Sequence, residues 1–426
     1  MKPSFILGLI LGLLITGVGT LQGGLLILTI PLMVYLFAAI ARRPEEVKLT
    51  VTREIFPDYA PQGTPITVKL TITNQGDAID ELAVQDVLPG GMMQTGGKSS
   101  AVSSLEAQGK IELEYTIEAQ RGEYNGYEVL VRARDFLSFF ERTSVYRTSP
   151  RLIVSPRYPK LNQIKIRPPQ TRGFAGPIAA RQGGTGIDFW GVREYHTGDP
   201  QRQINWKLAA RSFQEVYVNI FEQERVADVG LILDARQRAN VVTPAGSLFE
   251  HSVRATAALA ENFLSDGNRV SLLIYGSGMI RVFPGYGKTQ RDRILWSLAR
   301  AKVQINYALE SLEHLPTRFF PAKSQVVIFS PLLPEDIPVI VRIRAHGYAV
   351  MVISPDPISY QCAIYHDFTS LAYRLADAER NFILRQLRGR GIQIVNWHID
   401  QPLEAALSRT AAHQSLVVPD HRTRLL

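Results

Sequence analysis

The run VGLILD, residues 229–234, decides the fold of the second half of the chain. Its apolar residues follow one another without alternation and end in an acid, which is typical of a strand buried on both faces of a parallel sheet. Two similar runs, 326–330 and 348–354, follow it, and segments with helix start and stop signals separate them. Strands that alternate with helices predict a doubly wound α/β domain over residues 222–426. The loops that carry function are then expected after Asp234, Ser330 and Ser354, where strands end.

Residues 46–155 show a different pattern, in which apolar and polar residues alternate. Residues 66–72 and 111–117 are two clear examples, and Gly-containing turns separate such runs. Several half-buried strands at this spacing predict an antiparallel β-sandwich of immunoglobulin-like size. The residues carry no Cys-Trp-Cys signature, so membership of the immunoglobulin family itself is not indicated.

The N-terminus is apolar and contains no charged residue from position 5 to position 41. A single helix needs about 20 residues to cross a bilayer, so 37 residues predict a transmembrane hairpin over 1–43, with helices at about 5–20 and 24–41. Lys2 and the pair at 42–43 place both ends on the cytoplasmic side. A cleaved signal peptide is the alternative interpretation. We therefore expect a multi-pass protein of the inner cell membrane whose soluble domains face the cytoplasm.

Composition agrees with that location. The only cysteine is Cys362, which excludes an internal disulfide framework and suits a reducing compartment. The net charge of +8 is modest for 426 residues, and arginine is scattered rather than clustered. We expect a basic surface close to anionic lipid rather than a nucleic-acid partner.

Residues 156–221 are predicted to form a linker followed by a segment that mixes charges with aromatic residues. Opposite charges at this density can pair and hold an irregular segment in place. The segment is therefore either a docking or ligand site or an internal clamp that fixes the linker to the sheet. The candidate residues are Arg193, Glu194, Tyr195, Gly198, Asp199, Arg202, Trp206, Lys207 and Arg211.

This stretch, from Gly186 to Arg211, resembles the signature of the bacterial domain-of-unknown-function 58 family (DUF58). Residues 121–124 and 134–140 resemble the end of that family's β-domain, and residues 152–157 resemble its exit strand. The resemblance covers nearly the whole chain. It implies a membrane hairpin, a von Willebrand factor A-like domain, and an association with MoxR-type AAA+ ATPases in the assembly or maturation of other proteins. It implies no established reaction.

The von Willebrand factor A-like resemblance also implies a place to look for a metal. Such domains often bind Mg²⁺ through an Asp-x-Ser-x-Ser motif after the first strand. Asp234 is present here, but Arg236 and Arg238 stand where the serines belong. Arginine cannot ligate a cation, so no cofactor is expected and Mg²⁺ in particular is not. We hypothesise that Arg236 or Arg238 replaces the charge of the metal and pairs with Asp234 or with an acidic partner.

Two functions follow from these patterns. The chain has neither a Gly-x-Ser-x-Gly elbow nor a His-Glu-x-x-His pair, and its histidines are scattered. We therefore expect a membrane-anchored, non-catalytic interaction or adaptor protein that acts with a MoxR-type AAA+ ATPase on a client that the sequence does not identify. The alternative is an enzyme of membrane or envelope metabolism with residues 193–211 as its site.

Overall fold

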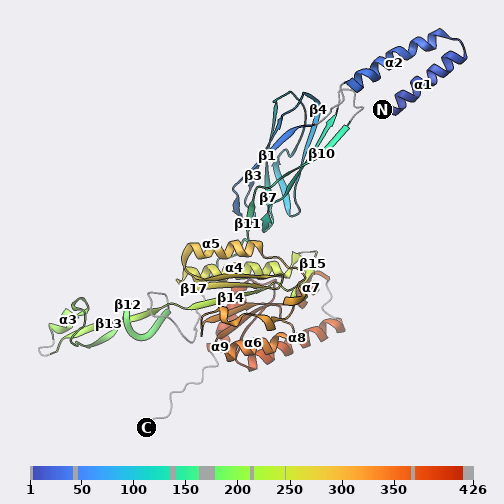
Figure 1. Cartoon of the computed structure of the whole chain (residues 1–426). Coiled ribbons are helices and arrows are strands. Elements are labelled where there is room, and N and C mark those ends of the chain that lie inside the picture. The colour runs from blue at the N-terminus through green and yellow to red at the C-terminus, as the bar shows by residue number, and fades with distance from the viewer. Residues whose placement is uncertain are drawn as a thin grey trace. The chain divides into compact units, whose positions relative to one another are not determined.

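The computed structural model describes residues 3–41, 47–134, 141–162, 178–211, 215–244, 246–365 and 370–415 (Figure 1). The chain divides into two compact units, Met1–Ser155 and Pro156–Leu426. The structure thus confirms a multidomain protein that is rich in β-strands.

The N-terminal segment forms two helices, α1 (Pro3–Gly19) and α2 (Gly23–Ala41), which pack against each other. A Cβ on Gly17 would lie 2.9 Å from the Leu26 side chain, so glycine permits the close approach of the helices. The predicted helical hairpin is present, but its assignment as transmembrane needs correction. Among the described residues, no helix is both long and apolar enough to cross a membrane.

Within residues 49–155, the described strands form two antiparallel four-stranded sheets, which enclose an apolar core, and one small mixed sheet. One four-stranded sheet has the order β1 (Leu49–Phe56), β3 (Ile66–Asn74), β7 (Lys110–Ala119), β5 (Met92–Gly97). The other has the order β10 (Glu141–Thr148), β9 (Tyr127–Arg134), β4 (Ile79–Val87), β6 (Ser100–Leu105). A small sheet joins β2 (Tyr59–Pro61), β11 (Leu152–Ser155) and β8 (Gly122–Tyr124). Leu70 from the first sheet packs with Val84 and Val131 from the second, which makes a sandwich.

The second unit contains a six-stranded sheet. Its order is β18 (Met279–Gly285), β17 (Arg269–Tyr275), β14 (Asp228–Asp234), β19 (Gln325–Phe329), β20 (Ala349–Pro355), β21 (Gln393–Trp397). All neighbouring strands are parallel except β18, which pairs antiparallel with β17 at one edge. The chain runs outward from β14 in one direction and then resumes at β19 on its other side. The carboxyl ends of β14 and β19 therefore form the topological switch point, where ligands bind in open α/β sheets.

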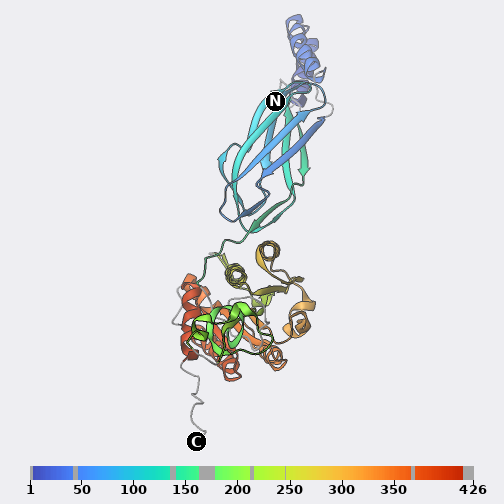
Figure 2. The same ribbon diagram turned by 90° about the vertical axis from the view of Figure 1, so that its left-hand side faces the viewer.

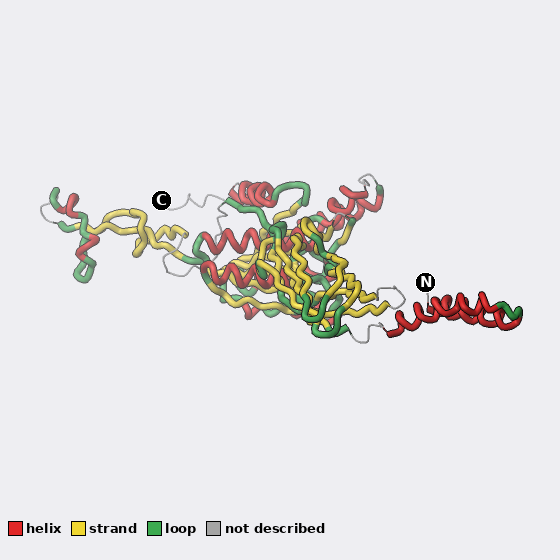
Figure 3. Tube along the Cα trace, turned by 90° about the horizontal axis from the view of Figure 1, so that it is seen from above, coloured by secondary structure: helices red, strands yellow, loops and turns green. Residues whose placement is uncertain are grey.

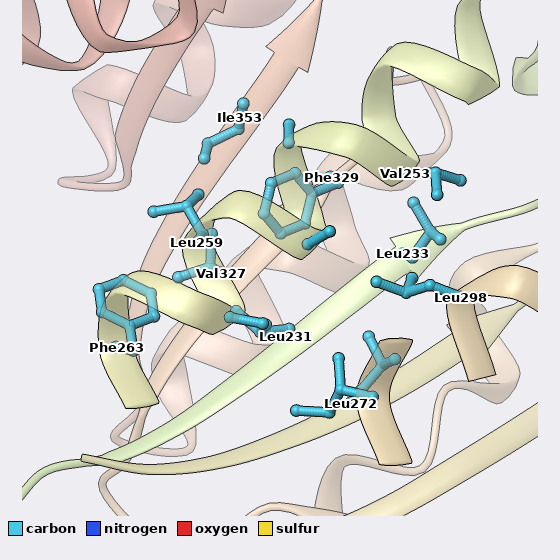
Figure 4. Close-up of a cluster of buried hydrophobic side chains, with 14 of the residues drawn as sticks. Leu231, Leu233, Val253, Leu259, Phe263, Leu272, Leu298, Val327, Phe329 and Ile353 are labelled. Atoms are coloured by element: carbon cyan, nitrogen blue, oxygen red, sulfur yellow. The ribbon is translucent and has the colours of Figure 1, made fainter. Parts of the chain in front are cut away.

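Helices cover both faces of this sheet (Figures 1 and 2). They are α4 (Leu248–Ser265), α5 (Gly287–Arg300), α6 (Asp336–Ala345), α7 (Pro357–Tyr365), α8 (Leu371–Gly389) and α9 (Leu403–Ser415). On one face, Leu231 and Leu233 pack with residues of α4 and α5 (Figure 4). Residues of α9 belong to the same buried cluster. On the other face, Ile232 packs with residues of α6 and α8. Every residue of β14 is buried, as its unbroken apolar sequence predicts, whereas α7 and α9 were not predicted.

The described residues between 178 and 225 contain a pair of strands that the sequence analysis did not predict. Strands β12 (Ile178–Glu194) and β13 (Tyr217–Arg225) form an antiparallel ribbon, with register shifts near Gly183 and Phe189. Glycines and these irregularities break the alternation that marks a strand in sequence. The turn at the end of the ribbon contains a 3₁₀ turn (Gln201–Gln203) and the short helix α3 (Trp206–Ala209), as Figure 3 shows. The predicted linker residues 163–177 lie outside the described part of the chain.

Candidate functional site

The switch point is filled by a buried arginine. Asp234 ends β14, and Arg236 follows two residues later with only 1 % of its surface exposed. Its side chain turns back, so that Nε lies 2.9 Å from Asp234 Oδ1 and Nη2 lies 2.8 Å from Asp234 Oδ2. Of the pairings that the sequence suggested for Asp234, the structure thus shows the one with Arg236.

A second acid, Asp336, completes the contacts of this guanidinium. Nη1 donates to Asp336 Oδ1 at 2.9 Å and to the Glu310 carbonyl at 3.1 Å, and Nη2 donates to Asp336 Oδ2 at 2.7 Å. A guanidinium has five N–H donors, and here each has an acceptor within the protein. Arg236 is therefore a structural cation rather than a group free to bind a ligand.

The two carboxylates also accept hydrogen bonds from groups other than the guanidinium. The Ser330 hydroxyl donates to Asp234 Oδ2 at 2.6 Å, and the Leu333 N–H donates to Asp336 Oδ2 at 2.9 Å. Ser330 follows β19, whereas Asp336 begins α6. The sequence analysis expected a loop after Ser330 but missed Asp336. Asp336 could have been found as an acid in the first turn of a predicted helix that follows a predicted strand end.

Burial and ion pairing act in opposite directions on these groups. Desolvation by itself would lower the pKa of Arg236, but its contacts with Asp234 and Asp336 raise that pKa well above the ordinary value. Burial raises the pKa of Asp336, although the hydrogen bonds from Arg236 offset part of the effect. Two acids and one base share this buried space, so the cluster depends on the guanidinium for its charge balance.

The residues at this position do not fit a divalent cation. Mg²⁺ would need open oxygen ligands in octahedral geometry, whereas the Asp234 oxygens already accept from Arg236 and Ser330. The guanidinium occupies the space between the two carboxylates, and its charge repels a cation. Within the described ranges, no group of three or more potential ligands is placed to hold a metal.

Arg238 lies at the surface above this cluster. It forms an ion pair of 2.9 Å with Glu335, and both side chains are about half exposed. Nearby, Arg236 forms an isolated β-bridge with Gln304, and the next residues expose Ile305 and Tyr307. We call Arg238, Ile305, Tyr307 and Glu335 the strand-end surface. It combines apolar side chains with a weak, solvent-exposed ion pair.

A second buried arginine, Arg380 of α8, lies beside the ends of β20 and β21. Its Nη1 donates to the Pro331 carbonyl at 2.8 Å, and Nη2 donates to Asn396 Oδ1 at 2.8 Å. Its Nε lies 3.2 Å from the buried Asp356, and desolvation lowers the pKa of Arg380. Two internal arginines therefore fix the loops along the carboxyl edge of the sheet.

The charged-aromatic segment contains an internal clamp of its own. Arg193 donates two hydrogen bonds to Asp199, at 2.7 and 2.6 Å, and the His196 N–H donates to the same carboxylate at 2.9 Å. These hydrogen bonds from Arg193 and His196 lower the pKa of Asp199 to about 2. Gly198 has a φ of 110°, which this tight turn requires. The clamp folds the turn on itself rather than fixing it to the six-stranded sheet.

The rest of this turn is ordered by Asn205. Its backbone N–H donates to Tyr217, its side chain donates to Asn219 at 2.8 Å, and its Oδ1 accepts from the Leu208 N–H to cap α3. The remaining predicted residues point outward: Glu194, Tyr195, Arg202, Trp206, Lys207 and Arg211 are all exposed. The structure does not bring them together with Asp234, Arg236 and Arg238 in any described contact.

Part of the chain matches a known protein family. Residues 191–358 match the family model described as "Protein of unknown function DUF58". The match confirms the predicted resemblance to the DUF58 family over this segment of the chain. It runs from the ribbon through the switch point to the start of α7. No curated protein matches the chain at a significant level.

Three solved structures illustrate the remaining similarities. Alpha-2-macroglobulin from Escherichia coli is 16 % identical, with 30 % of this chain and 20 % of that chain covered and a TM-score of 0.23. A FixG-related protein from Vibrio parahaemolyticus is 13 % identical over 25 % and 97 % of the two chains, with a TM-score of 0.16. A CARDB domain from Pyrococcus furiosus is 16 % identical over 26 % and 96 %, with a TM-score of 0.18. The match spans about a fifth of the macroglobulin chain.

Proposed function

We propose that this protein is a non-catalytic interaction protein that binds a partner through its strand-end surface. The observation that carries the proposal is the satisfied guanidinium of Arg236. At a switch point, an enzyme would place polar groups that are open to a substrate. Here Arg236, Asp234 and Asp336 use their polar atoms on one another. What remains open to solvent is a mixed apolar and charged surface, which suits protein recognition.

We further propose that the α/β domain is von Willebrand factor A-like and that the partner is a MoxR-type AAA+ ATPase. The strand order and the single antiparallel edge strand support the first point. The DUF58 match supports the second through the association implied by the family resemblance. The complex would act in the assembly or maturation of other proteins. In this arrangement the internal arginine allows partner binding without a metal.

The N-terminal hairpin gives the proposed location. Leu21, Ile27 and Phe37 expose 92, 67 and 74 % of their surfaces on it. Exposed apolar surface of this kind is characteristic of membrane or protein contacts. We propose that the lipid bilayer covers it, with the charged ends of the hairpin and both soluble domains on the cytoplasmic side, where an ATPase can reach them.

Affinity purification of the full-length protein from detergent-solubilised membranes tests the partner. The wild-type protein should retain an AAA+ ATPase. Tyr307→Arg should reduce that retention about tenfold, because Tyr307 is an exposed aromatic residue of the strand-end surface and aromatic residues often dominate the energy of an interface. Phe382→Arg, at an exposed aromatic on α8, is the matched control and should retain the ATPase. Equal retention by both variants, or no ATPase in the wild-type sample, would exclude the proposal. If the protein is instead an enzyme with residues 193–211 as its site, Arg193→Ala should retain its partners but lose catalytic turnover.

A further inference from the structure

The ribbon tip, defined as residues 193–211, is built to present its outward side chains in a fixed arrangement. The Arg193–Asp199 pair closes it at one point. Tyr195 donates its backbone N–H to Val216, and Ile204 forms a β-bridge with Val218. A rigid segment loses little conformational entropy when it binds. The tip is therefore pre-organised although it is exposed.

Its position also favours contact with another molecule. The register pairs Ile178 with Arg225 at one end of the ribbon and Glu194 with Tyr217 at the other. Arg225 leads into β14, so the tip lies at the opposite end of a nine-residue strand, about 30 Å along the ribbon. The tip is thus separate from the strand-end surface.

The chemistry of the exposed side chains identifies the partner. Trp206 exposes 69 % of its surface. Arg202, Lys207 and Arg211 are exposed around it in sequence, and no described residue pairs with any of them. Residues 193–211 contain four Lys/Arg and two Asp/Glu, which gives a net charge of +2. Trp and Arg are the residues that most often dominate the energy of a protein interface.

We infer that the ribbon tip is a docking element that inserts Trp206 into an apolar pocket rimmed by acidic side chains on a partner protein. A partner protein fits better than an anionic bilayer, because the tip also exposes Glu194 at its base and has a fixed shape. A uniformly negative surface would repel that acid, whereas a protein pocket can match both charge and shape. The inference goes beyond the proposed function, since the two surfaces lie on different elements and either can fail without the other.

The test uses the full-length protein in its own cells, with a photoreactive benzoylphenylalanine at position 206. Irradiation should give one protein adduct, mapped to a segment with Asp or Glu side chains beside an apolar pocket. Lys207→Glu should reduce the adduct yield about tenfold, since reversing a charge at a complementary rim replaces attraction with repulsion. Arg385→Glu, at an exposed arginine of α8, is the matched control and should leave the yield unchanged.

A charge exchange completes the experiment. Replacing the mapped partner carboxylate with lysine should restore the adduct in the Lys207→Glu protein. The inference is overturned by adducts to lipid or nucleic acid alone, by no protein adduct, or by an adduct that Lys207→Glu and Arg385→Glu affect equally. Retention of the ATPase in the same samples reports separately on the strand-end surface, so failure of one proposal does not imply failure of the other.

Discussion

Arg236 Nη2 lies 2.7 Å from Asp336 Oδ2, although the two residues are 100 positions apart in the chain. This ion pair joins the loop after β14 to the start of α6. Both side chains are buried, with 1 % or less of their side-chain surface exposed. The two elements lie on either side of the switch point, so this pair fixes the shape of the strand-end surface above it.

Removal of the guanidinium should destabilise the α/β domain. Arg236→Met leaves two buried carboxylates without a counter-charge, which costs about 3–5 kcal/mol in comparable cases. Amide hydrogen exchange in β14 and β19 of the full-length protein measures the loss. Arg238→Met, which removes an ion pair that is about half exposed, is the control and should change stability by about 0.5 kcal/mol or less. Similar protection in the two variants would contradict the buried network.

The same variant should respond to pH in a definite direction. Burial raises the pKa of Asp336 in the folded protein, so its contribution to stability is present at low pH and is lost as the pH rises above the unfolded value of 3.8. Without Arg236 this effect is larger, because the guanidinium no longer offsets it. Arg236→Met should therefore recover part of its lost stability between pH 7 and pH 4. The measurement is the melting temperature of the variant and of the wild type at each pH. A difference between them that stays constant from pH 7 to pH 4 would disprove the prediction.

Gly276 should be indispensable to the loop that carries Arg236. Its φ is +144°, and a Cβ there would lie 2.3 Å from the Arg236 backbone nitrogen. Gly276→Ala should cost about 3 kcal/mol through strain and displacement of that backbone. Gly278→Ala, two residues away, meets no atom within 4 Å and serves as the control. Thermal unfolding of the two variants should differ clearly, and equal midpoints would show that the loop can move aside.

Magnesium should leave the stability of the wild-type protein unchanged. A ligand that binds only the folded state raises the melting temperature, but Arg236 already occupies the space between Asp234 and Asp336. Thermal unfolding with and without millimolar Mg²⁺ measures this directly. A rise in melting temperature that disappears in Asp234→Ala would show that a metal displaces the guanidinium.

The sequence predicted those parts of the structure that depend on local pattern. The unbroken apolar run 229–234 is a fully buried strand, and Ser370 caps the long helix α8. The pairing of Arg236 with Asp234 is also local, since the two residues are two positions apart. Asp336 is different, because only the parallel pairing of β14 with β19 brings it to the same place. No spacing in one sequence encodes that contact.

The ribbon was missed for a related reason. Glycines at 183, 184, 186 and 191 interrupt the alternation of β12. Its pairing with β13 across three register shifts, rather than its own propensity, makes it a strand. The charged residues at its end were recognised as candidates. Their division into an internal clamp and an outward surface depends on side-chain direction, which composition does not give.

The clamp makes a prediction that NMR can measure. Hydrogen bonds from Arg193 and the His196 N–H hold the pKa of Asp199 at about 2, against an ordinary value of 3.8. Because the folded pKa is depressed, the clamp contributes fully above pH 3.8 and is lost as the pH falls toward 2. In Arg193→Gln the Asp199 carboxyl should titrate closer to 3.8. An unchanged titration would mean that Arg193 does not hold this carboxylate in solution.

The hairpin leads to the last prediction, which concerns location. Between Phe5 and Phe37 it exposes apolar side chains and carries no charged residue, so water is an unfavourable surrounding for it. The full-length protein should sediment with membranes and resist extraction by high salt, whereas a chain lacking residues 3–41 should be released. Salt extraction separates apolar insertion from electrostatic binding, because salt screens charges but does not weaken apolar burial. A reporter that works only in the cytoplasm should be active when it is fused after Leu426, whereas a reporter that works only in the periplasm should be inactive there. Periplasmic activity at that position would overturn the proposed orientation and, with it, access of a cytoplasmic ATPase to the strand-end surface.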